Sequence, residues 1–566
     1  MPEPSPQPRR RLPAWLAPVG LVLLAALVRL PGFNWGLPGP THLFSYHPDE
    51  YHSLRGLFSV VLLGDPNPHF FNYGSLYLYL VTLAVLLLHP GADPAAWSQQ
   101  MKAGQAEPLL RAWTLDARLV SLAASLATVY VVYLLALRLT GRGGALAAAG
   151  LVAVAPLASI TARYATVDPT QALFLCLALY CSVLLFSRPT GKTALWAGVC
   201  AGLAASTKYN GIVVLVAPLL AVCLAPVAAP VLPAASQQGK RKRRATGETL
   251  VLPGRGAVRA RALQGLAAVA GAAVAFAVTS PYTFLAWSEA RSGILFEFQH
   301  ARGGEQWAVL ADPSGFLFHL KQLLAPGLGL AVVLAVVGAG WVLARRRREW
   351  YPLLLFAAVW FVMIGLAQTR YPRYELPLIA PLAVLAVAPL GDMARGRRAY
   401  GAALALAALL ALFWCGQVAV GLSGPRPQDQ ALAYLLAHST ANDQVGFVDT
   451  PWFADPPVDF CNGGTGISSM PLWRASQREA RPVAVTTSRI SFASGVAPPD
   501  WFVTTDFDLG AAVRAGDATA SQELLTLARE HRATSWGGVP LRLVPWPLGP
   551  DWRYPWPRIE LWQKKQ

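Results

Sequence analysis

The length, composition and charge of the chain exclude an ordinary soluble globular protein. The 566 residues are 54% hydrophobic and 14% charged, with a mean hydropathy of +0.40, so their apolar surface is too large for one soluble core. The formal net charge is +17, but the basic residues cluster between apolar runs, which fits membrane topology and argues against a nucleic-acid partner. The sequence therefore predicts an integral membrane protein.

Eleven runs of mostly uncharged residues are long enough to cross a bilayer, which takes roughly 17 to 25 residues each. The first run follows Arg9-Arg10-Arg11 and precedes Pro31-Gly32, a poor site for signal cleavage, so we expect it to remain as a helix. The predicted spans are 12–30, 118–137, 143–162, 170–187, 192–207, 209–229, 263–284, 322–344, 350–369, 375–391 and 399–420.

A further apolar run, residues 73–88, decides on which side of the membrane each loop lies. If this run does not cross, the basic loops all fall on the cytoplasmic side, as the positive-inside rule requires; if it crosses, every basic loop after the first lies outside. We therefore predict a re-entrant or interfacial helix here. The chain is then a multi-pass protein of the inner (plasma) membrane with a cytoplasmic N-terminus, a long outer loop at 31–116 and a basic cytoplasmic loop at 231–262.

The composition changes after the membrane part, residues 1–420, because charged sequence containing Trp and Pro replaces the uniform apolar runs. Strands alternating with helices predict a small α/β domain at 421–566. Eleven crossings place this domain on the outer face, periplasmic or extracellular. The predicted elements are helices at 430–438 and 522–531 and strands at 444–449, 482–487 and 501–505.

An acidic pair, Asp49-Glu50, follows His47-Pro48 at the start of the outer loop, just after the first helix leaves the membrane. One interpretation is a helix start, with the acids in a first turn that the helix dipole stabilises. The other is a carboxylate held at the membrane interface as a general base.

A second acidic motif contains Arg163 and Asp168-Pro169 at the next outer turn. Asp followed by Pro is typical of an N-cap, here for a helix that starts at Thr170. A capping carboxylate is also rigidly positioned, so the capping role and a role in chemistry are compatible.

Cations stand at outer helix ends, against the positive-inside trend: Lys208 before Tyr209, and Arg370 and Arg373 on either side of Tyr371-Pro372. Snorkelling beside interfacial tyrosines would explain any one of them. Together with the two acidic motifs they describe an anion site facing acids at headgroup level. One reaction that needs this arrangement is displacement of phosphate from a polyprenyl-phosphate sugar, in which cations stabilise the departing oxygen and a base deprotonates the acceptor.

The motifs and their order along the chain resemble the GT-C glycosyltransferases over roughly residues 12–420. Within that superfamily they are most similar to glycosyltransferase family 39, the branch of protein O-mannosyltransferases and bacterial lipid A aminoarabinose transferases. The residues that carry this resemblance are Asp49-Glu50, Arg163 with Asp168, Gly202 to Lys208, and Arg370-Tyr371 to Pro377.

The resemblance implies a GT-C membrane fold, an inverting mechanism, a polyprenyl-phosphate-linked sugar donor and a protein, lipid or glycan acceptor. It implies Asp49 as the catalytic carboxylate, with Asp168 supporting it or orienting the acceptor, and Lys208 and Arg370 near the carrier phosphate. The catalytic candidates are thus Asp49, Glu50 and Asp168, and the substrate-binding candidates are His47, Arg163, Lys208, Tyr209, Arg370, Tyr371 and Arg373.

No cofactor is required by these motifs, although some relatives bind a divalent metal at this face. Glu297, His300 and Glu305 are the candidate ligands in the outer loop, where solvated side chains are the alternative interpretation.

Other functions remain open at this point. A transporter or flippase of lipid-linked sugars also needs many helices, but transporters place charges near the bilayer midplane, whereas the candidates here lie at helix ends. A polymerase or ligase of surface polysaccharide is the alternative within enzymes, and an assembly factor could use 421–566 as a binding module.

Overall fold

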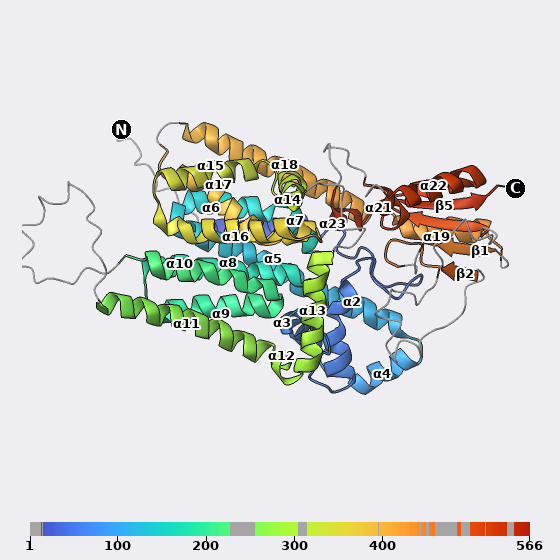
Figure 1. Cartoon of the computed structure of the whole chain (residues 1–566), viewed down its shortest axis with the longest axis horizontal. Helices are drawn as coiled ribbons and strands as arrows, with labels where there is room; N and C mark the ends of the chain where they lie inside the picture. Colours follow the sequence, from blue (N-terminus) through green and yellow to red (C-terminus); the bar gives the residue numbers. More distant parts are fainter. Residues whose placement is uncertain are drawn as a thin grey trace, which may run out of the picture.

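The computed structural model of the chain consists of a helical part followed by a domain built on a β-sheet (Figure 1). Most of the long helices run roughly parallel to one another, and the sheet domain lies at one end of the helical part. The residues that the structure describes are 13, 15–226, 255–303, 314–393, 396–440, 443–448, 452–458, 484–487, 499–514, 517–539 and 548–565.

The helical part contains long helices joined by short helices and turns. In chain order its elements are α1 (Leu16–Arg29), α2 (Glu50–Ser53), η1 (Leu57–Leu62), α3 (Leu76–Leu88), α4 (Pro94–Lys102), α5 (Ala106–Thr140), α6 (Arg142–Ala153), α7 (Pro156–Thr161), α8 (Val167–Ser187), α9 (Gly191–Thr207), η2 (Tyr209–Leu215), α10 (Val216–Leu224), α11 (Arg255–Thr279), α12 (Tyr282–Leu285), α13 (Trp287–Gly303), α14 (Gly315–Gln322), η4 (Leu323–Gly327), α15 (Ala331–Ala344), η5 (Arg348–Trp350), α16 (Tyr351–Leu366), η6 (Pro372–Glu375), α17 (Leu376–Ala386), η7 (Ala388–Gly391) and α18 (Arg397–Ser423).

Every predicted span overlaps a helix, but fewer helices are long enough to cross a membrane alone. Among the described residues, six helices are long and apolar enough, and a pair bent by 115°, Gly315–Gly327 with Ala331–Ala344, brings the number to seven. Some of the other predicted spans are divided, as where Pro156 starts a new helix after α6. A polytopic helical protein is confirmed, while the number of eleven crossings stays a prediction.

Two predicted loops are shorter than expected because helices extend into them. α5 starts at Ala106, inside the predicted outer loop 31–116, and α11 starts at Arg255, inside the predicted basic loop 231–262. Hydropathy marks only the apolar middle of a helix and misses polar turns that extend past it. Residues 231–254 of the basic loop lie outside the described residues.

The apolar run at 73–88 forms the single helix α3 of 13 residues. At 1.5 Å per residue it is about 20 Å long, shorter than a hydrocarbon core of about 30 Å. This length fits the predicted re-entrant or interfacial helix, which stays a prediction.

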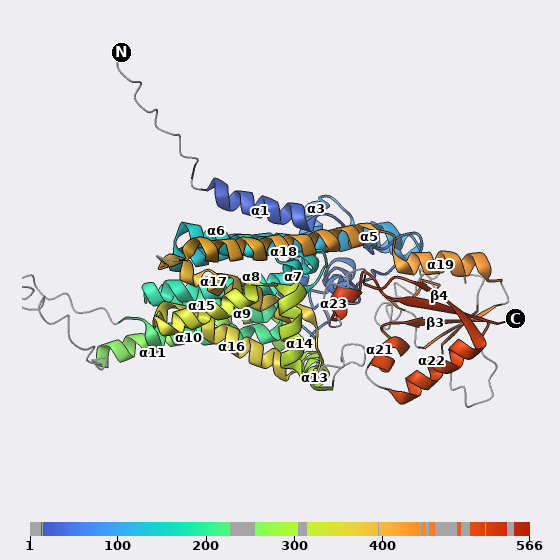
Figure 2. The same ribbon diagram turned by 90° about the horizontal axis from the view of Figure 1, so that it is seen from above.

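The loops predicted to be cytoplasmic lie together at one end of the helical part. Arg347 pairs with Asp392 at 3.0 Å, which joins the turns before α16 and α18. Gln264 of α11 donates to the carbonyl of Pro189, between α8 and α9, at 2.8 Å. α1 starts at this same end, and the sheet domain lies at the other (Figure 2). The relative sidedness of the loops therefore agrees with the prediction.

Small residues let α9 pack closely on its neighbours. A Cβ on Gly198 would lie 1.9 Å from the carbonyl oxygen of Ala268 in α11, and one on Gly74 would lie 2.1 Å from that of Ser206. Only glycine permits such approaches. As a result, the outer loop before α3 lies directly on the end of α9, next to Lys208.

Among its described residues, the C-terminal domain contains a five-stranded sheet in the order β2-β1-β3-β5-β4. β2, β1 and β3 are parallel, and β5 runs antiparallel to both β3 and β4. The elements are α19 (Pro427–His438), β1 (Gln444–Phe447), β2 (Ala484–Thr487), β3 (Trp501–Thr505), α21 (Leu509–Arg514), α22 (Ala518–Glu530), β4 (His531–Trp536), α23 (Pro550–Arg553) and β5 (Ile559–Lys564).

The predicted small α/β domain is confirmed, and its five predicted elements match α19, α22, β1, β2 and β3. The sequence analysis did not anticipate β4, β5, α21 or α23. β4 has the pattern of an exposed edge strand, with little apolar sequence to mark it, and α23 has only four residues.

The C-terminal domain shares a hydrophobic core with the helical part. Trp552, Tyr554 and Trp556 are buried in the same cluster as side chains of the long helices. A Cβ on Gly421, near the end of α18, would lie 1.9 Å from the ring of Trp556. The sheet domain is thus fixed to the helices at the point where α23 meets them.

Candidate active site

A cavity of about 880 Å³ lies at the end of the helical part nearest the sheet domain. The outer loop, α13 and the turn before α17 line it, and the C-terminal domain contributes Trp452. Its charged lining side chains are Asp49, Arg55, Lys208, Glu289, Glu297 and Arg373.

Asp49 lies directly before α2, with its carboxylate in this cavity. A helix does start here, with Asp49 at the N-cap position and Glu50 in the first turn, but the side chain of Asp49 makes no capping hydrogen bond. Instead, Oδ2 pairs with Nη2 of Arg373 at 2.8 Å, and 24% of the side chain is exposed. Burial raises the pKa of Asp49, but Arg373, with help from Lys208 and two histidines, outweighs it, so the pKa lies below its ordinary value. Asp49 is therefore ionised at neutral pH.

Asp168 lies in the first turn of α8, and the prediction that it caps the helix is wrong. α8 starts at Val167 with Thr166 as its N-cap, one turn earlier than the Asp-Pro signature suggested. Pro169 is tolerated there because a first turn has no use for its missing N–H. The carboxylate of Asp168 accepts from Nζ of Lys208 at 3.1 Å and lies 4.0 Å from Nε of Arg373.

Arg373 joins the two acidic motifs, because its guanidinium contacts Asp49 and approaches Asp168. The same guanidinium lies over the ring of Tyr371, 3.9 Å from its centroid. The ammonium of Lys208 lies 4.9 Å from the centroid of Tyr374. Of the residues predicted from sequence, the structure thus brings together five: Asp49, Asp168, Lys208, Tyr371 and Arg373.

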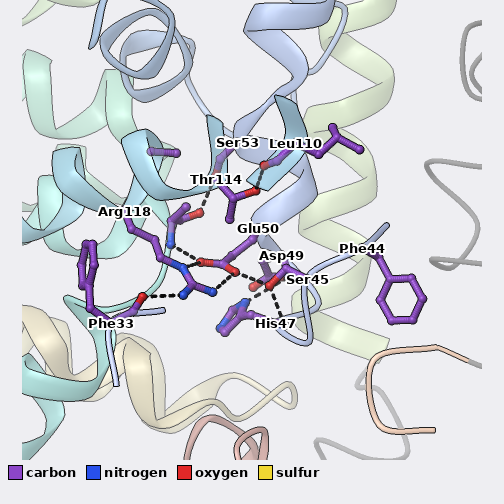
Figure 3. A network of polar contacts seen from close by, with 12 residues as sticks. Phe33, Phe44, Ser45, His47, Asp49, Glu50, Ser53, Leu110, Thr114 and Arg118 are labelled. Atoms are coloured by element: carbon purple, nitrogen blue, oxygen red, sulfur yellow. Dashed lines mark hydrogen bonds and ion pairs between the residues drawn. The ribbon is translucent and has the colours of Figure 1, made fainter. Parts of the chain in front are cut away.

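Glu50 does not line the cavity, although it is next to Asp49, and its carboxylate points toward Arg118 (Figure 3). Its carboxylate accepts two bonds of 2.7 Å from Arg118 of α5 and one of 2.7 Å from the backbone N–H of Ala165. Both members of the ion pair are 1% exposed. Burial raises the pKa of Glu50, but Arg118 outweighs it and leaves the pKa below its ordinary value. The pair ties the acidic loop to α5 and to the turn before α8.

Sequence reasoning missed Arg118, although a signal was available. An arginine at the start of an apolar run needs a partner if it is buried. Arg118 begins the predicted span 118–137, and Glu50 supplies that partner.

Arg163 also lies outside the cavity lining. Its guanidinium donates to the backbone carbonyls of Pro31 at 2.9 Å, Val28 at 2.6 Å and Ser159 at 2.6 Å. These bonds join the end of α1 to α7. The donors of Arg163 are therefore directed at backbone carbonyls within the helical part.

The remaining predicted binding residues do not line the cavity either. His47 is buried behind Asp49, and its Nδ1 accepts from the backbone N–H of Asp49 at 3.2 Å. Tyr209 donates to the carbonyl of Phe71 at 3.0 Å, and Arg370 lies beside the cavity-lining Tyr371 in sequence.

A buried aspartate of the C-terminal domain, Asp551, is the main residue that the sequence analysis missed. It accepts a bond of 2.6 Å from Nη1 of Arg373. No short motif surrounds it, and 178 residues separate the two partners, so the sequence alone carries no signal for this contact.

Comparisons with known proteins bear on the fold of the chain. A family model described as dolichyl-phosphate-mannose-protein mannosyltransferase matches residues 110–232. The crystal structure of ArnT from Cupriavidus metallidurans in the apo state superposes with a TM-score of 0.51 at 16% identity, covering 96% of this chain and 97% of that chain. The chain has the GT-C glycosyltransferase fold. The fold expected from the ordered motifs is thereby confirmed.

Other GT-C structures superpose less well. ArnT from the same organism bound to undecaprenyl phosphate gives a TM-score of 0.49 at 16% identity, covering 96% of this chain and 97% of that chain. The archaeal oligosaccharyltransferase AglB from Archaeoglobus fulgidus, in complex with an inhibitory peptide and a dolichol-phosphate, gives 0.45 at 14% identity over 75% and 58%. No match was found among curated proteins.

Two of the three candidate metal ligands, Glu297 and His300, are described, and both line the cavity. Glu297 accepts from the amide of Asn72 at 2.8 Å, His300 stacks on Phe296, and Glu305 lies outside the described residues. Among described residues, no three or more His, Cys, Asp or Glu side chains are grouped to hold a metal ion.

Proposed function

We propose that this protein is an integral-membrane inverting glycosyltransferase that moves a sugar from a polyprenyl-phosphate carrier to a protein, lipid or glycan acceptor. The observation that carries the proposal is the cavity in which Asp49, ionised and partly exposed, shares Arg373 with Asp168 beside Lys208. An anionic leaving group needs those cations, and the acceptor needs that base.

In this mechanism the carrier phosphate enters the cavity and competes with the carboxylates for Arg373 and Lys208. Charge-assisted hydrogen bonds from these two side chains then stabilise the negative charge that grows on the phosphate oxygen as it leaves. The bond from the sugar's anomeric carbon to that oxygen breaks, and its electron pair stays on the phosphate. Attack from the opposite face inverts the anomeric carbon.

Asp49 takes the proton of the acceptor as the new glycosidic bond forms. Arg373 is the largest of the influences that lower the pKa of Asp49. When the phosphate draws Arg373 away, the pKa of Asp49 rises and the carboxylate becomes a stronger base. Donor binding therefore prepares the base for the step that follows.

Glu50, His47 and Arg163 have positioning roles in this proposal. Glu50 and Arg118 fix the loop that carries Asp49, and His47 accepts from the backbone of Asp49. Arg163 holds the neighbouring end of α1.

An apolar groove beside the cavity supports a lipid-linked donor. The groove has a volume of about 520 Å³ and runs between η2, α11 and α12. Tyr209 lines the groove and also bonds to the carbonyl of Phe71, which lines the cavity. A prenyl chain in this groove would bring its phosphate toward Lys208.

The sidedness of the basic loops supports a cytoplasmic N-terminus with the cavity and the 421–566 domain on the outer face of the plasma membrane. Cysteine labelling from each side of the membrane, with a single cysteine in place of Gln238 or of Ser521, tests this orientation. A labelling reagent that cannot cross the membrane should reach position 521 and not position 238.

The decisive experiment incubates the purified full-length protein with a set of radiolabelled polyprenyl-phosphate sugars and candidate acceptors. Label should move from the lipid to an acceptor with the wild-type protein and stay on the lipid with Asp49→Asn. If label crosses a reconstituted membrane while still attached to its carrier, and no transfer occurs, the protein is a flippase and the proposal is wrong.

A further inference from the structure

The four-residue helix α23 of the C-terminal domain is seated beside the cavity, on the turn that contains Arg373. The backbone N–H of Gly549 donates to Oε1 of Gln322 at 3.2 Å. A Cβ on Gly549 would lie 2.4 Å from Cγ of Pro372. The backbone of the C-terminal domain therefore packs against the residue that precedes Arg373.

α23 is also fixed to its own domain. Nη1 of Arg553 donates to the carbonyl of Asp506, just after β3, at 3.0 Å. The ring of Tyr554 stacks on Phe507 with 5.5 Å between centroids. These contacts fix α23 relative to the sheet.

Asp551 holds Arg373 through both its side chain and its backbone. Oδ1 accepts from Nη1 of the guanidinium at 2.6 Å, and Oδ2 accepts from the backbone N–H of Arg373 at 2.8 Å. The side chain of Asp551 is only 2% exposed. These bonds leave Nη2 directed at Asp49, which lines the cavity.

Asp49 and Asp551 both pair with the guanidinium of Arg373, and together they determine its orientation. A free guanidinium favours two parallel bonds to a single carboxylate. Because Nη1 bonds Asp551 and Nε lies 4.0 Å from Asp168, Nη2 is the nitrogen that Arg373 offers to Asp49. That nitrogen is then available to a phosphate that enters from the cavity.

We propose that Asp551 is a positioning residue of the transfer site, which holds the guanidinium of Arg373 so that one terminal nitrogen faces Asp49 and the donor phosphate. This inference rests on the proposed function, because it assigns that nitrogen to the donor. The C-terminal domain completes the site instead of serving only as a separate binding module.

The test measures binding of undecaprenyl phosphate to the full-length protein in detergent, with Asp551→Asn as the main variant. Asn has the shape of Asp but loses the charge, so Arg373 turns toward Asp49 and the dissociation constant rises about tenfold, as expected for one lost charge-assisted contact.

The matched control is Asp429→Asn. Asp429 is a second aspartate of the C-terminal region that accepts a bond from the helical part, from the hydroxyl of Tyr46 at 2.6 Å, and its ion pair is with Arg426 instead of Arg373. This control should change the dissociation constant less than about twofold, because it loses an interdomain hydrogen bond without moving Arg373.

A double-mutant cycle separates positioning from general loss of structure. If Asp551 acts through Arg373, the double variant Asp551→Asn with Arg373→Gln should bind no more weakly than Arg373→Gln alone. Fully additive losses, or an Asp551→Asn protein with wild-type affinity beside a weakened Arg373→Gln, would overturn the inference.

A second variant keeps the test valid if Asp551→Asn does not fold. Gly549→Ala pushes α23 away from Pro372 without changing any charge, and it should also weaken binding. Unchanged affinity in Gly549→Ala would then overturn the inference. A wild-type protein that binds no undecaprenyl phosphate would instead contradict the proposed function.

Discussion

Asp49 and Glu50 are neighbours that each pair with an arginine, yet their surroundings differ. The carboxylate of Asp49 is 24% exposed in a cavity, and its partner Arg373 is shared with two other aspartates. Glu50 and Arg118 are each 1% exposed and bond to each other in parallel. The comparison teaches that access to the cavity, and not the acidic motif itself, separates a candidate base from a structural ion pair.

The largest expected effect is on turnover in Asp49→Asn. Loss of the base should lower the transfer rate about 100- to 10,000-fold, because a positioned general base contributes that much. The variant should remain folded, since its carboxylate caps no helix. Transfer assays with labelled donor and thermal unfolding of the same sample check both points. A rate near that of the wild type would remove Asp49 from the chemistry.

Glu50→Gln should lose activity for a different reason, namely loss of stability. Breaking a buried ion pair leaves Arg118 with an uncompensated charge, which costs about 3 to 5 kcal/mol of stability. The second substitution Arg118→Met, added to Glu50→Gln, should recover part of the loss, because a neutral apolar pair of similar size needs no partner. Thermal unfolding in detergent measures both variants. A stable Glu50→Gln protein without activity would make Glu50 the base instead.

Lys208→Ala tests whether access to the cavity also identifies the cation that binds the donor phosphate. Losing one charge-assisted contact to phosphate should weaken donor binding by about 1.5 to 3 kcal/mol. Arg370→Ala is the control, because Arg370 does not line the cavity, and it should have the smaller effect. Titration with undecaprenyl phosphate measures both affinities. Equal losses of affinity in the two variants would mean that lining the cavity does not identify the residues that bind the phosphate.

The smallest effect is expected at the cavity rim, where a third ion pair is exposed. His69 lies 2.8 Å from both Asp65 and Glu289, and its side chain is 46% exposed. Hydrogen bonds to Asp65 and then Glu289 raise the pKa of His69 above its ordinary value. Its stabilisation is therefore complete below about pH 6.5 and is lost as the pH rises through the higher folded-state pKa.

His69→Gln should remove that pH dependence. Solvent screening limits the effect to less than about 1 kcal/mol. Melting temperatures of the two proteins should differ at pH 6 and converge near pH 8.5, well above the ordinary His pKa of about 6.5. A constant difference across this range would mean that the protonation of His69 contributes nothing.

The sequence predicted the fold and the charged cluster around Arg373 because both depend on local patterns. Apolar runs mark helices, and Asp49, Asp168, Lys208 and Arg373 each stand at a helix end, where side chains from distant runs meet. The order of those motifs was enough to indicate one shared site.

What the sequence could not predict depends on tertiary burial. Asp49 and Glu50 have the same neighbours in sequence, and only the position of α5 makes one of them inaccessible. Asp168 was predicted to cap α8 because Asp followed by Pro is typical of an N-cap. The sequence did not show that the helix already starts at Val167, with Thr166 as its N-cap. Asp551 belongs to a domain without a recognised motif, so its contact with Arg373 appears only in three dimensions.

The seat of α23 on the Pro372 turn has a consequence for protein engineering. A chimera could exchange residues 421–566 for the corresponding domain of another protein with the GT-C fold. It would then also exchange Gly549 and Asp551, which contact the turn that contains Arg373. Such a graft would join correctly only if the donor domain carried a matching short helix, or if residues 370–376 were transplanted with it. The boundary at which the two proteins are joined should therefore lie before residue 370, within the membrane part, and not after residue 420, where the composition changes.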